Sequence, residues 1–344
     1  MTALLEVDNL VVRFPTSAGD FDAVAGVSFK VAAGERVGLV GESGSGKSVT
    51  AQALMRLVPP PGRIEEGSSV RFDGRDILAL SEHEVRRWRG AEAAMVFQDP
   101  MSSLNPLVRV GRQIVETLRE HLGVDRREGE SRAAELLARV GIPDARARLR
   151  DYPMALSGGM RQRVCIAIAA SCSPRLTIAD EPTTALDVTV QAQVLDLLDS
   201  MADELDTAVV LISHDLGVVS SFCDRILVMY AGHIVESGTT GQIIEDPRHP
   251  YTRALLGSIP RLTGDPPRRL PSIPGSHPAV GPRPDGCPFA PRCPLVTDVC
   301  REVFPAEVTV QPGHQVACHA VGADAHAGTS RPVPSSAARG EAAE

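Results

Sequence analysis

The segment that most constrains this chain is residues 41–48, whose letters GESGSGKS fit the pattern G-x-x-x-x-G-K-[ST]. An apolar run at 36–40 precedes the segment, and a helix-like stretch at 48–57 follows it. A strand, a glycine-rich loop and a helix in this order form a phosphate-binding loop, in which backbone N–H groups and the helix N-terminus face phosphate oxygens. A glycine- and serine-rich turn without a ligand is the alternative, and the flanking runs disfavour it. The pattern therefore predicts a nucleotide site.

Each residue type in this loop has an expected task. Lys47 supplies positive charge to the outer phosphates, and the hydroxyl of Ser48 is expected to bind Mg²⁺. The glycines let the backbone turn its amides toward the ligand. We expect nucleotide contacts along the whole loop: Gly41, Glu42, Ser43, Gly44, Ser45, Gly46, Lys47 and Ser48.

Length and composition set broad limits. A chain of 344 residues with 43% hydrophobic residues can bury a large core, as one large domain or two modest ones. The net charge of -8 argues against a surface that coats nucleic acid, so we expect no nucleic-acid partner. The apolar runs are shorter than the roughly 18–20 residues of a spanning helix. The start of the chain lacks a secretory signal pattern, which predicts a cytoplasmic protein.

The pattern along the chain predicts a mixed α/β fold. Residues 4–40 look like antiparallel strands that lead into the loop, and residues from about 99 to 165 repeat apolar positions at helical spacing. A hairpin is expected at 225–236. Proline and arginine become dense after Gly238, which predicts an irregular accessory region. The tail, residues 320–344, is rich in Ala, Gly, Ser and Pro and is expected to be disordered.

Two buried-looking strands end in functional residues. The run 175–179 is followed by Asp180 and Glu181, and the run 208–212 is followed after one serine by His214. In parallel α/β sheets the carboxyl ends of strands line the ligand crevice. Asp180 is expected to hold Mg²⁺ opposite Ser48, and Glu181 to orient or deprotonate an attacking water. A carboxylate pair that only caps a turn is the alternative, and His214 taken alone is more often structural.

The order of these motifs resembles the nucleotide-binding subunit of ATP-binding cassette (ABC) transporters over about residues 4–260. In that family residues 41–48 correspond to the Walker A loop, and Met160 stands where the signature motif usually ends in Gln. The resemblance implies a P-loop NTPase cassette with a mixed sheet core, an antiparallel β lead-in and a helical subdomain at about 99–165. The other matching motifs are the Q-loop at Gln98, the signature at 156–160, Walker B at 176–181, the D-loop with Ala185 and Asp187, and the switch histidine at His214.

The resemblance also implies roles for these residues. Two cassettes would close head to tail, so that Ser157, Gly158 and Gly159 of one contact the γ-phosphate at Lys47 of the other. The family's adenine-stacking position falls at Phe14, whereas spacing alone favours a core ring there. The implied catalytic residues are Glu181, His214 and Lys47, the implied Mg²⁺ ligands are Ser48, Gln98 and Asp180, and the further nucleotide contacts are Phe14, Gln98 and Asp187.

Residues 98–106, 160–164 and 249–256 narrow the resemblance to the oligopeptide/dipeptide importer ATPases, whose relatives also carry nickel. This implies an ATPase on the cytoplasmic face of the membrane that powers peptide import. The implied partners are a second cassette, identical or paralogous, two membrane permease subunits that dock near 98–106, and, indirectly, an extracytoplasmic solute-binding protein. Dipeptides, oligopeptides and nickel stay open as substrates.

Four late cysteines lie in the accessory region, residues 261–319: Cys287, Cys293, Cys300 and Cys318. A cytoplasmic location disfavours disulfides, and the spacing lacks the C-x2-C pairs of structural zinc sites. On spacing alone an iron–sulfur cluster, zinc and unliganded thiols are equally favoured. Peptide-importer ATPases with a similar late cysteine set carry a [4Fe–4S] cluster, so the resemblance favours the cluster. The single cysteines Cys165, Cys172 and Cys223 are expected to be small buried residues.

Two functions from other classes are the alternatives. A soluble ATP-driven clamp on ribosomes or DNA usually has two cassettes in one chain or long heptad coiled coils, and this sequence has neither pattern. A regulatory nucleotide binder would not need hydrolytic residues, yet Glu181 and His214 are both present.

Overall fold

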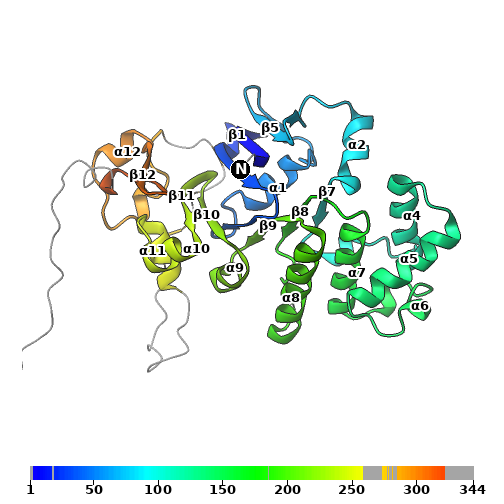
Figure 1. The fold of residues 1–344 in the computed structure, drawn as a ribbon. Coiled ribbons are helices and arrows are strands. Elements are labelled where there is room, and N and C mark those ends of the chain that lie inside the picture. The colour runs from blue at the N-terminus through cyan, green and yellow to red at the C-terminus, as the bar shows by residue number, and fades with distance from the viewer. Residues whose placement is uncertain are drawn as a thin grey trace, which may run out of the picture.

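In the computed structural model, the chain folds around two β-sheets (Figure 1). It describes residues 3–17, 19–184, 186–258, 273–276, 278, 281 and 285–321. The alternation of strands and helices around a mixed main sheet confirms the predicted α/β class. Within the described ranges, no helix has both the length and the apolar character needed to cross a membrane.

The smaller sheet contains five strands and is antiparallel. β1 and β2 form a long hairpin, with Thr16 opposite Gly19 next to the turn. The sequence predicted shorter runs here. The strands are continuous because bulges shift the register and keep apolar residues such as Leu5, Leu10 and Val12 in the core. The strands of this sheet are β1 (Ala3–Thr16), β2 (Gly19–Ala32), β4 (Arg63–Ile64), β5 (Ser69–Phe72) and β6 (Arg75–Asp76).

The main sheet has eight strands in the order β12-β13-β11-β10-β3-β9-β8-β7. The neighbours from β10 to β7 pair in parallel. Parallel strands are covered on both faces, which explains why every residue of β8 and β9 is buried. The central strands are β3 (Arg36–Val40), β7 (Ala93–Val96), β8 (Leu176–Asp180), β9 (Ala208–Ser213), β10 (Arg225–Tyr230) and β11 (His233–Thr239).

The two faces of the main sheet pack in different cores. Along β9, Val209 and Leu211 join the core with the helices, while Val210 and Ile212 join the core with the smaller sheet. Figure 1 shows α8 and α9 on one side of the strands and α1 with the smaller sheet on the other. The covering helices are α1 (Lys47–Leu54), α2 (Glu82–Ala91), α8 (Val188–Leu205) and α9 (Leu216–Phe222).

Helices fill the stretch between β7 and β8, where the sequence places the helical subdomain. α4 has Ile114, Val115 and Leu118 buried against its neighbours, as its apolar spacing predicted. The 3₁₀ turn η1 (Pro153–Ala155) leads into α7. The helices here are α3 (Pro100–Ser103), α4 (Val110–Leu122), α5 (Arg126–Arg139), α6 (Ala145–Arg148) and α7 (Gly158–Ala170).

The C-terminal part is more regular than its sequence suggested. β13 pairs with β11, with Glu236 opposite Val316, so a late hairpin extends the main sheet. These strands are short and are flanked by prolines and cysteines, which hides their periodicity. The elements here are α10 (Thr240–Glu245), α11 (Pro250–Gly257), η2 (Ala290–Arg292), α12 (Val299–Glu302), β12 (Glu307–Gln311) and β13 (His314–Ala317).

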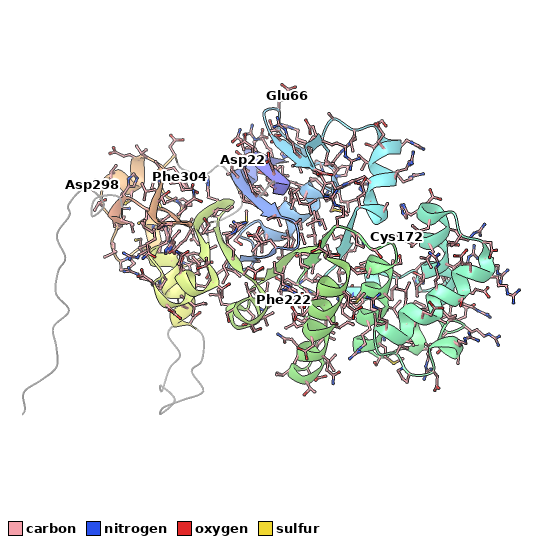
Figure 2. The ribbon with its side chains drawn as sticks, viewed as in Figure 1. Asp22, Glu66, Cys172, Phe222, Asp298 and Phe304 are labelled. Carbon is pink, nitrogen blue, oxygen red and sulfur yellow. The ribbon has the colours of Figure 1, made fainter. Side chains whose placement is uncertain are left out.

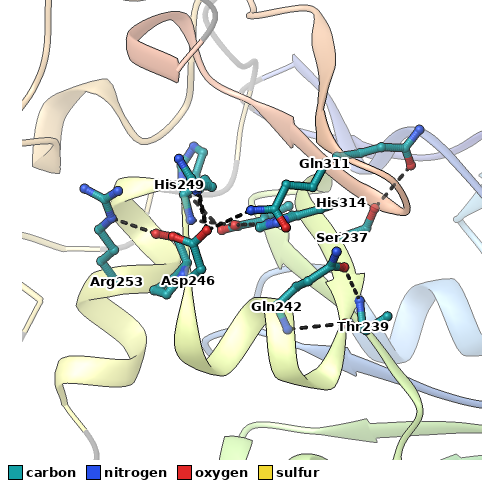
Figure 3. Close-up of polar contacts among 12 residues, drawn as sticks. Ser237, Thr239, Gln242, Asp246, His249, Arg253, Gln311 and His314 are labelled. Atoms are coloured by element: carbon teal, nitrogen blue, oxygen red, sulfur yellow. Dashed lines mark hydrogen bonds and ion pairs between the residues drawn. The ribbon is translucent and has the colours of Figure 1, made fainter. Parts of the chain in front are cut away.

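Buried polar contacts join this C-terminal part to the cassette (Figure 3). His314 Nε2 lies 2.8 Å from a carboxylate oxygen of Glu236, and both side chains are fully buried. Glu236 also accepts the backbone N–H of His249 at 2.9 Å. Phe304, labelled in Figure 2, stacks on His233 with ring centroids 4.2 Å apart.

Within the tail predicted to be disordered, residues 322–344 lie outside the described residues, whereas 320–321 are helical.

Candidate nucleotide site

The phosphate-binding loop connects β3 to α1, as the sequence predicted. Gly46 precedes the helix with φ of 107°, and a Cβ atom there would lie 2.3 Å from the carbonyl oxygen of Ala23. A Cβ at Gly41 would lie 2.1 Å from the carbonyl oxygen of Met229. The strands β2 and β10 therefore press on the loop from two sides, and only glycine fits at either position.

Lys47 is folded back over the curve of the loop. Its Nζ donates to the carbonyl oxygens of Gly41 at 2.8 Å and Glu42 at 2.9 Å. Burial lowers the pKa of Lys47, while the nearby carboxylates Glu181, Asp180 and Glu42 oppose that shift. The side chain thus places one ammonium group at the loop, where it can meet the phosphates of a nucleotide.

Ser48 and Asp180 meet across the site. The Ser48 Oγ donates to Asp180 Oδ1 at 3.0 Å, although 132 positions separate the two residues. Asp180 ends β8 and is 5% exposed, and this burial raises the pKa of its carboxyl group, while the Ser48 hydrogen bond lowers it. A hydroxyl and a carboxylate in contact are an oxygen pair suited to Mg²⁺.

Glu181 lies at the centre of a second group of side chains. Gln98 Nε2 donates to Glu181 Oε2 at 2.9 Å, and His214 Nδ1 lies 3.4 Å from Glu181 Oε1. Thr184 Oγ1 also donates to Glu181 Oε2, at 2.8 Å. The backbone of Glu181 has φ of 46°, in the left-handed region that residues other than glycine seldom adopt. Gln98 therefore contacts Glu181 in this structure rather than the Ser48–Asp180 pair.

Sequence reasoning missed Thr184. It lies three residues after Glu181 in a turn, and its backbone N–H donates to the Glu181 carbonyl at 3.1 Å. A threonine in a turn has no distinctive pattern, so only the folded geometry identifies it.

The signature residues lie at another corner of the molecule. Ser157 caps α7 by accepting the N–H of Met160, and a Cβ at Gly159 would lie 2.7 Å from Val190 of α8. Asp187 caps α8 through the same Val190, whose N–H it accepts at 3.0 Å. Among the described residues, no hydrogen bond joins this corner to the phosphate-binding loop. The D-loop residue Ala185 lies outside the described residues.

Phe14 is half-buried at the end of the hairpin in the smaller sheet, opposite Phe21. A Cβ at Gly62 would lie 2.4 Å from its ring, so the segment after α1 covers part of that ring. The adenine-stacking role of Phe14 stays a prediction.

The chain matches two protein families. Residues 24–184 match the family described as ABC transporter, and residues 235–300 match the C-terminal region of the oligopeptide/dipeptide transporters. The oligopeptide transport ATP-binding protein OppD of Salmonella typhimurium is 49% identical over 315 residues, covering 92% of this chain and 93% of OppD. The chain belongs to the ATP-binding subunits of the ABC peptide transporters.

Two further comparisons agree with this family. The dipeptide transport ATP-binding protein DppD of Escherichia coli is 50% identical to this ABC ATPase over 317 residues, covering 92% of this chain and 96% of DppD. The dimeric post-hydrolysis structure of the cassette MJ0796 with ADP and Pi has a TM-score of 0.62 at 26% identity, and covers 69% of this chain and 98% of that chain. Both the fold and the sequence thus identify a nucleotide-binding cassette.

Two turns that carry late cysteines of this ABC ATPase lie side by side. The backbone N–H of Cys287 donates to the carbonyl of Cys300 at 2.8 Å, which brings two separate turns together. Burial raises the pKa of the Cys287 thiol to about 11, with smaller contributions from Cys318, Cys300 and Cys293. In the part of the chain that the structure describes, however, no three His, Cys, Asp or Glu side chains are arranged to hold a metal ion.

Two of the single cysteines are buried as predicted, namely Cys165 and Cys223. Cys172, labelled in Figure 2, is half-buried because it follows the end of α7 rather than lying inside it.

Proposed function

We propose that this ABC ATPase hydrolyses ATP to drive the import of dipeptides or oligopeptides. One observation carries the hydrolytic part: Glu181 is held by Gln98 and Thr184 and lies beside His214, next to the Ser48–Asp180 pair. The peptide specificity is supported by the names of the relatives OppD and DppD and by the matched C-terminal region. A nickel or other small-solute importer is the alternative within the family.

Different residues have different roles in the phosphoryl transfer that we propose. Lys47 and the loop amides bind the phosphates, while Ser48 and Asp180, with Gln98, would hold Mg²⁺, which neutralises phosphate charge when bound. Glu181 orients a water and accepts its proton, and His214 stabilises charge on the transferred group. Phe14 would contact the adenine and Asp187 the dimer interface near the nucleotide.

The nucleotide site is completed by a second cassette. Ser157, Gly158 and Gly159 of one subunit contact the γ-phosphate bound at Lys47 of the other, so ATP joins the two subunits. The exposure of Ser157 and Gly158, and the dimeric form of the MJ0796 cassette, support this arrangement. The second cassette is either an identical copy or a paralogue.

The assembly we propose is peripheral, on the cytoplasmic face of the membrane. Two integral permease subunits dock near residues 98–106, where Met101 and the adjoining Leu107 expose apolar surface, and a solute-binding protein on the other side of the membrane acts indirectly. We propose residues 4–260 as the cassette domain, about 99–165 as its helical subdomain, 261–319 as the accessory region and 320–344 as the tail.

An uptake experiment tests the peptide assignment. A strain that lacks this gene should lose growth on di- or oligopeptides as the amino-acid source, and the wild-type gene should restore it while the Glu181→Gln gene should not. Nickel uptake is measured in parallel. Normal peptide uptake together with loss of nickel uptake would replace the peptide assignment by the nickel alternative.

We also propose that Cys287, Cys293, Cys300 and Cys318 bind a [4Fe–4S] cluster. The backbone contact between Cys287 and Cys300 supports this assignment, and a cluster would draw the four side chains closer together than they lie here. Anaerobic purification followed by iron, sulfide and zinc analysis is the test. Four irons and four sulfides per chain are expected for one full cluster, whereas stoichiometric zinc without iron would contradict it.

A further inference from the structure

Residues of the C-terminal part reach the phosphate-binding loop at Glu42. The guanidinium of Arg292 forms two parallel hydrogen bonds with the Glu42 carboxylate, with Nη1 2.7 Å from Oε2 and Nη2 3.0 Å from Oε1. The two residues are 250 positions apart in the chain. A paired, fork-like contact of this kind fixes orientation as well as charge.

Contacts other than the one to Glu42 also fix the side chain of Arg292. Its Nε donates to the Pro274 carbonyl at 2.8 Å, and Nη1 also lies 3.3 Å from the Tyr230 hydroxyl. The guanidinium lies over the rings of Tyr230 and Phe289, 5.8 and 5.9 Å from their centroids. The side chain is only 4% exposed, so its position is set by packing rather than by solvent.

The backbone of Glu42 is fixed from the same side. Its N–H donates to the Tyr251 hydroxyl at 2.8 Å, which ties the main chain of the loop to α11. Tyr251 belongs to α11 and packs on Tyr230 and Phe289, with ring centroids 4.6 and 5.4 Å apart. One aromatic cluster thus supports both contacts to Glu42.

A carboxylate in a phosphate-binding loop needs such compensation. Glu42 lies beside Lys47, whose Nζ donates to the Glu42 carbonyl oxygen at 2.9 Å. Without a partner its negative charge would weaken the field of Lys47 and repel the phosphates of ATP. Removing one member of a largely buried ion pair leaves the other charge uncompensated.

We propose that Arg292 is a positioning residue of the nucleotide site, which neutralises Glu42 and fixes the start of the phosphate-binding loop. This inference rests on the proposed role of residues 41–48 in binding the nucleotide. It makes the cysteine-bearing C-terminal part necessary for tight ATP binding.

The test is calorimetric titration of the purified full chain with ATP. Arg292→Met should raise the Kd for ATP about tenfold, because Glu42 then carries an unpaired charge. Glu42→Gln should lower the Kd severalfold, because Arg292 then adds net positive charge, and in the double variant the affinity should recover to near the wild-type value. If the contact between Arg292 and Glu42 only held the loop in shape and its charges had no effect on ATP, binding of ATP would weaken in all three variants.

Two controls make the result decisive. Arg225→Met removes a half-buried ion pair with Glu35 next to the other ends of β3 and β10, and should leave the Kd unchanged. Lys47→Ala should abolish binding if residues 41–48 bind the nucleotide, and wild-type affinity in that variant would overturn both proposals. Loss of binding in Lys47→Ala with unchanged affinity in Arg292→Met would overturn this inference alone. If Arg292→Met does not fold, weaker binding by Glu42→Gln overturns it.

Discussion

Glu181 shows how neighbouring groups orient a single side chain. Gln98 and Thr184 hold the same carboxylate oxygen, and His214 lies beside the other. The carboxylate is therefore oriented by groups from the end of β7, from its own turn and from the end of β9. Orientation of this kind is what a group that positions an attacking water requires.

At the residue scale, Glu181→Gln should retain ATP affinity and lose turnover. The amide keeps the hydrogen bonds but cannot accept a proton, so we expect steady-state ATPase activity to fall at least about 100-fold. ATP should also trap a closed dimer, visible by size-exclusion chromatography. Glu204→Gln, an exposed carboxylate on α8, is the matched control and should behave as wild type. Wild-type turnover in Glu181→Gln would remove Glu181 from its proposed role.

Packing between a strand and a helix requires glycine at a position that no motif marks. Gly38 lies in the middle of β3, where α9 crosses the strand. A Cβ at Gly38 would lie 2.1 Å from Val219 Cγ1 and 3.2 Å from Cys223 Sγ. The phosphate-binding loop follows three residues later, so the approach of α9 to β3 also supports the site.

At the element scale, Gly38→Ala should lower the free energy of unfolding by about 1–3 kcal/mol, because the added methyl group overpacks the contact with α9. Urea denaturation measures the change. Gly241→Ala is the control, since nothing lies within 4 Å of a Cβ at that helical position. Equal unfolding midpoints for the two variants would show that α9 can move away at no cost.

The start of α11 contains a buried histidine, His249 (Figure 3). His249 caps this helix by accepting the Tyr251 N–H at its Nδ1, and burial lowers the pKa of its imidazole to about 3. Between pH 6.5 and 3 the unfolded chain binds a proton that the folded chain does not, so His249 makes stability fall as the pH falls through this range.

His249→Asn tests this titration. Asparagine can retain the cap but carries no proton in this range, so the free energy of unfolding should fall less steeply below pH 6.5 than in the wild type. The slopes should differ by up to about 1.4 kcal/mol per pH unit. Parallel stability curves for the two proteins would contradict a neutral, buried His249.

In the whole molecule, the phosphate-binding loop and the signature residues lie at the ends of different elements. The loop follows β3, whereas Ser157 starts α7 beside α8. The nucleotide site that we propose therefore needs residues from two copies of the chain, which is the physical reason to expect a dimer.

At this scale, mixing two inactive variants should restore activity. Lys47→Ala disables the loop and Ser157→Arg disables the signature, so a mixed dimer contains one site with both halves intact. ATPase activity should reappear on mixing, and the wild-type specific activity should rise with protein concentration. A wild-type activity independent of concentration, with no recovery on mixing, would show that one cassette is sufficient.

Local patterns predicted the parts of the site that lie next to each other in the chain. The loop at 41–48 and the strand ending at Asp180 are marked by glycines and by charge after an apolar run, and both lie where expected. The pairing of Ser48 with Asp180 followed from the rule for strand ends in parallel sheets. The roles of the signature residues depended on resemblance, because a glycine pair at a helix start has many uses.

The sequence by itself thus determined the phosphate-binding loop, the α/β class and the family of this protein. Only the tertiary structure placed Arg292 and Tyr251 on Glu42, because a contact across 250 residues leaves no periodicity to read. It also decided that β13 joins the main sheet and that Thr184 holds Glu181. Spacing can show that a loop is able to bind phosphate, whereas the charge balance of that loop depends on which distant side chains the fold brings to it.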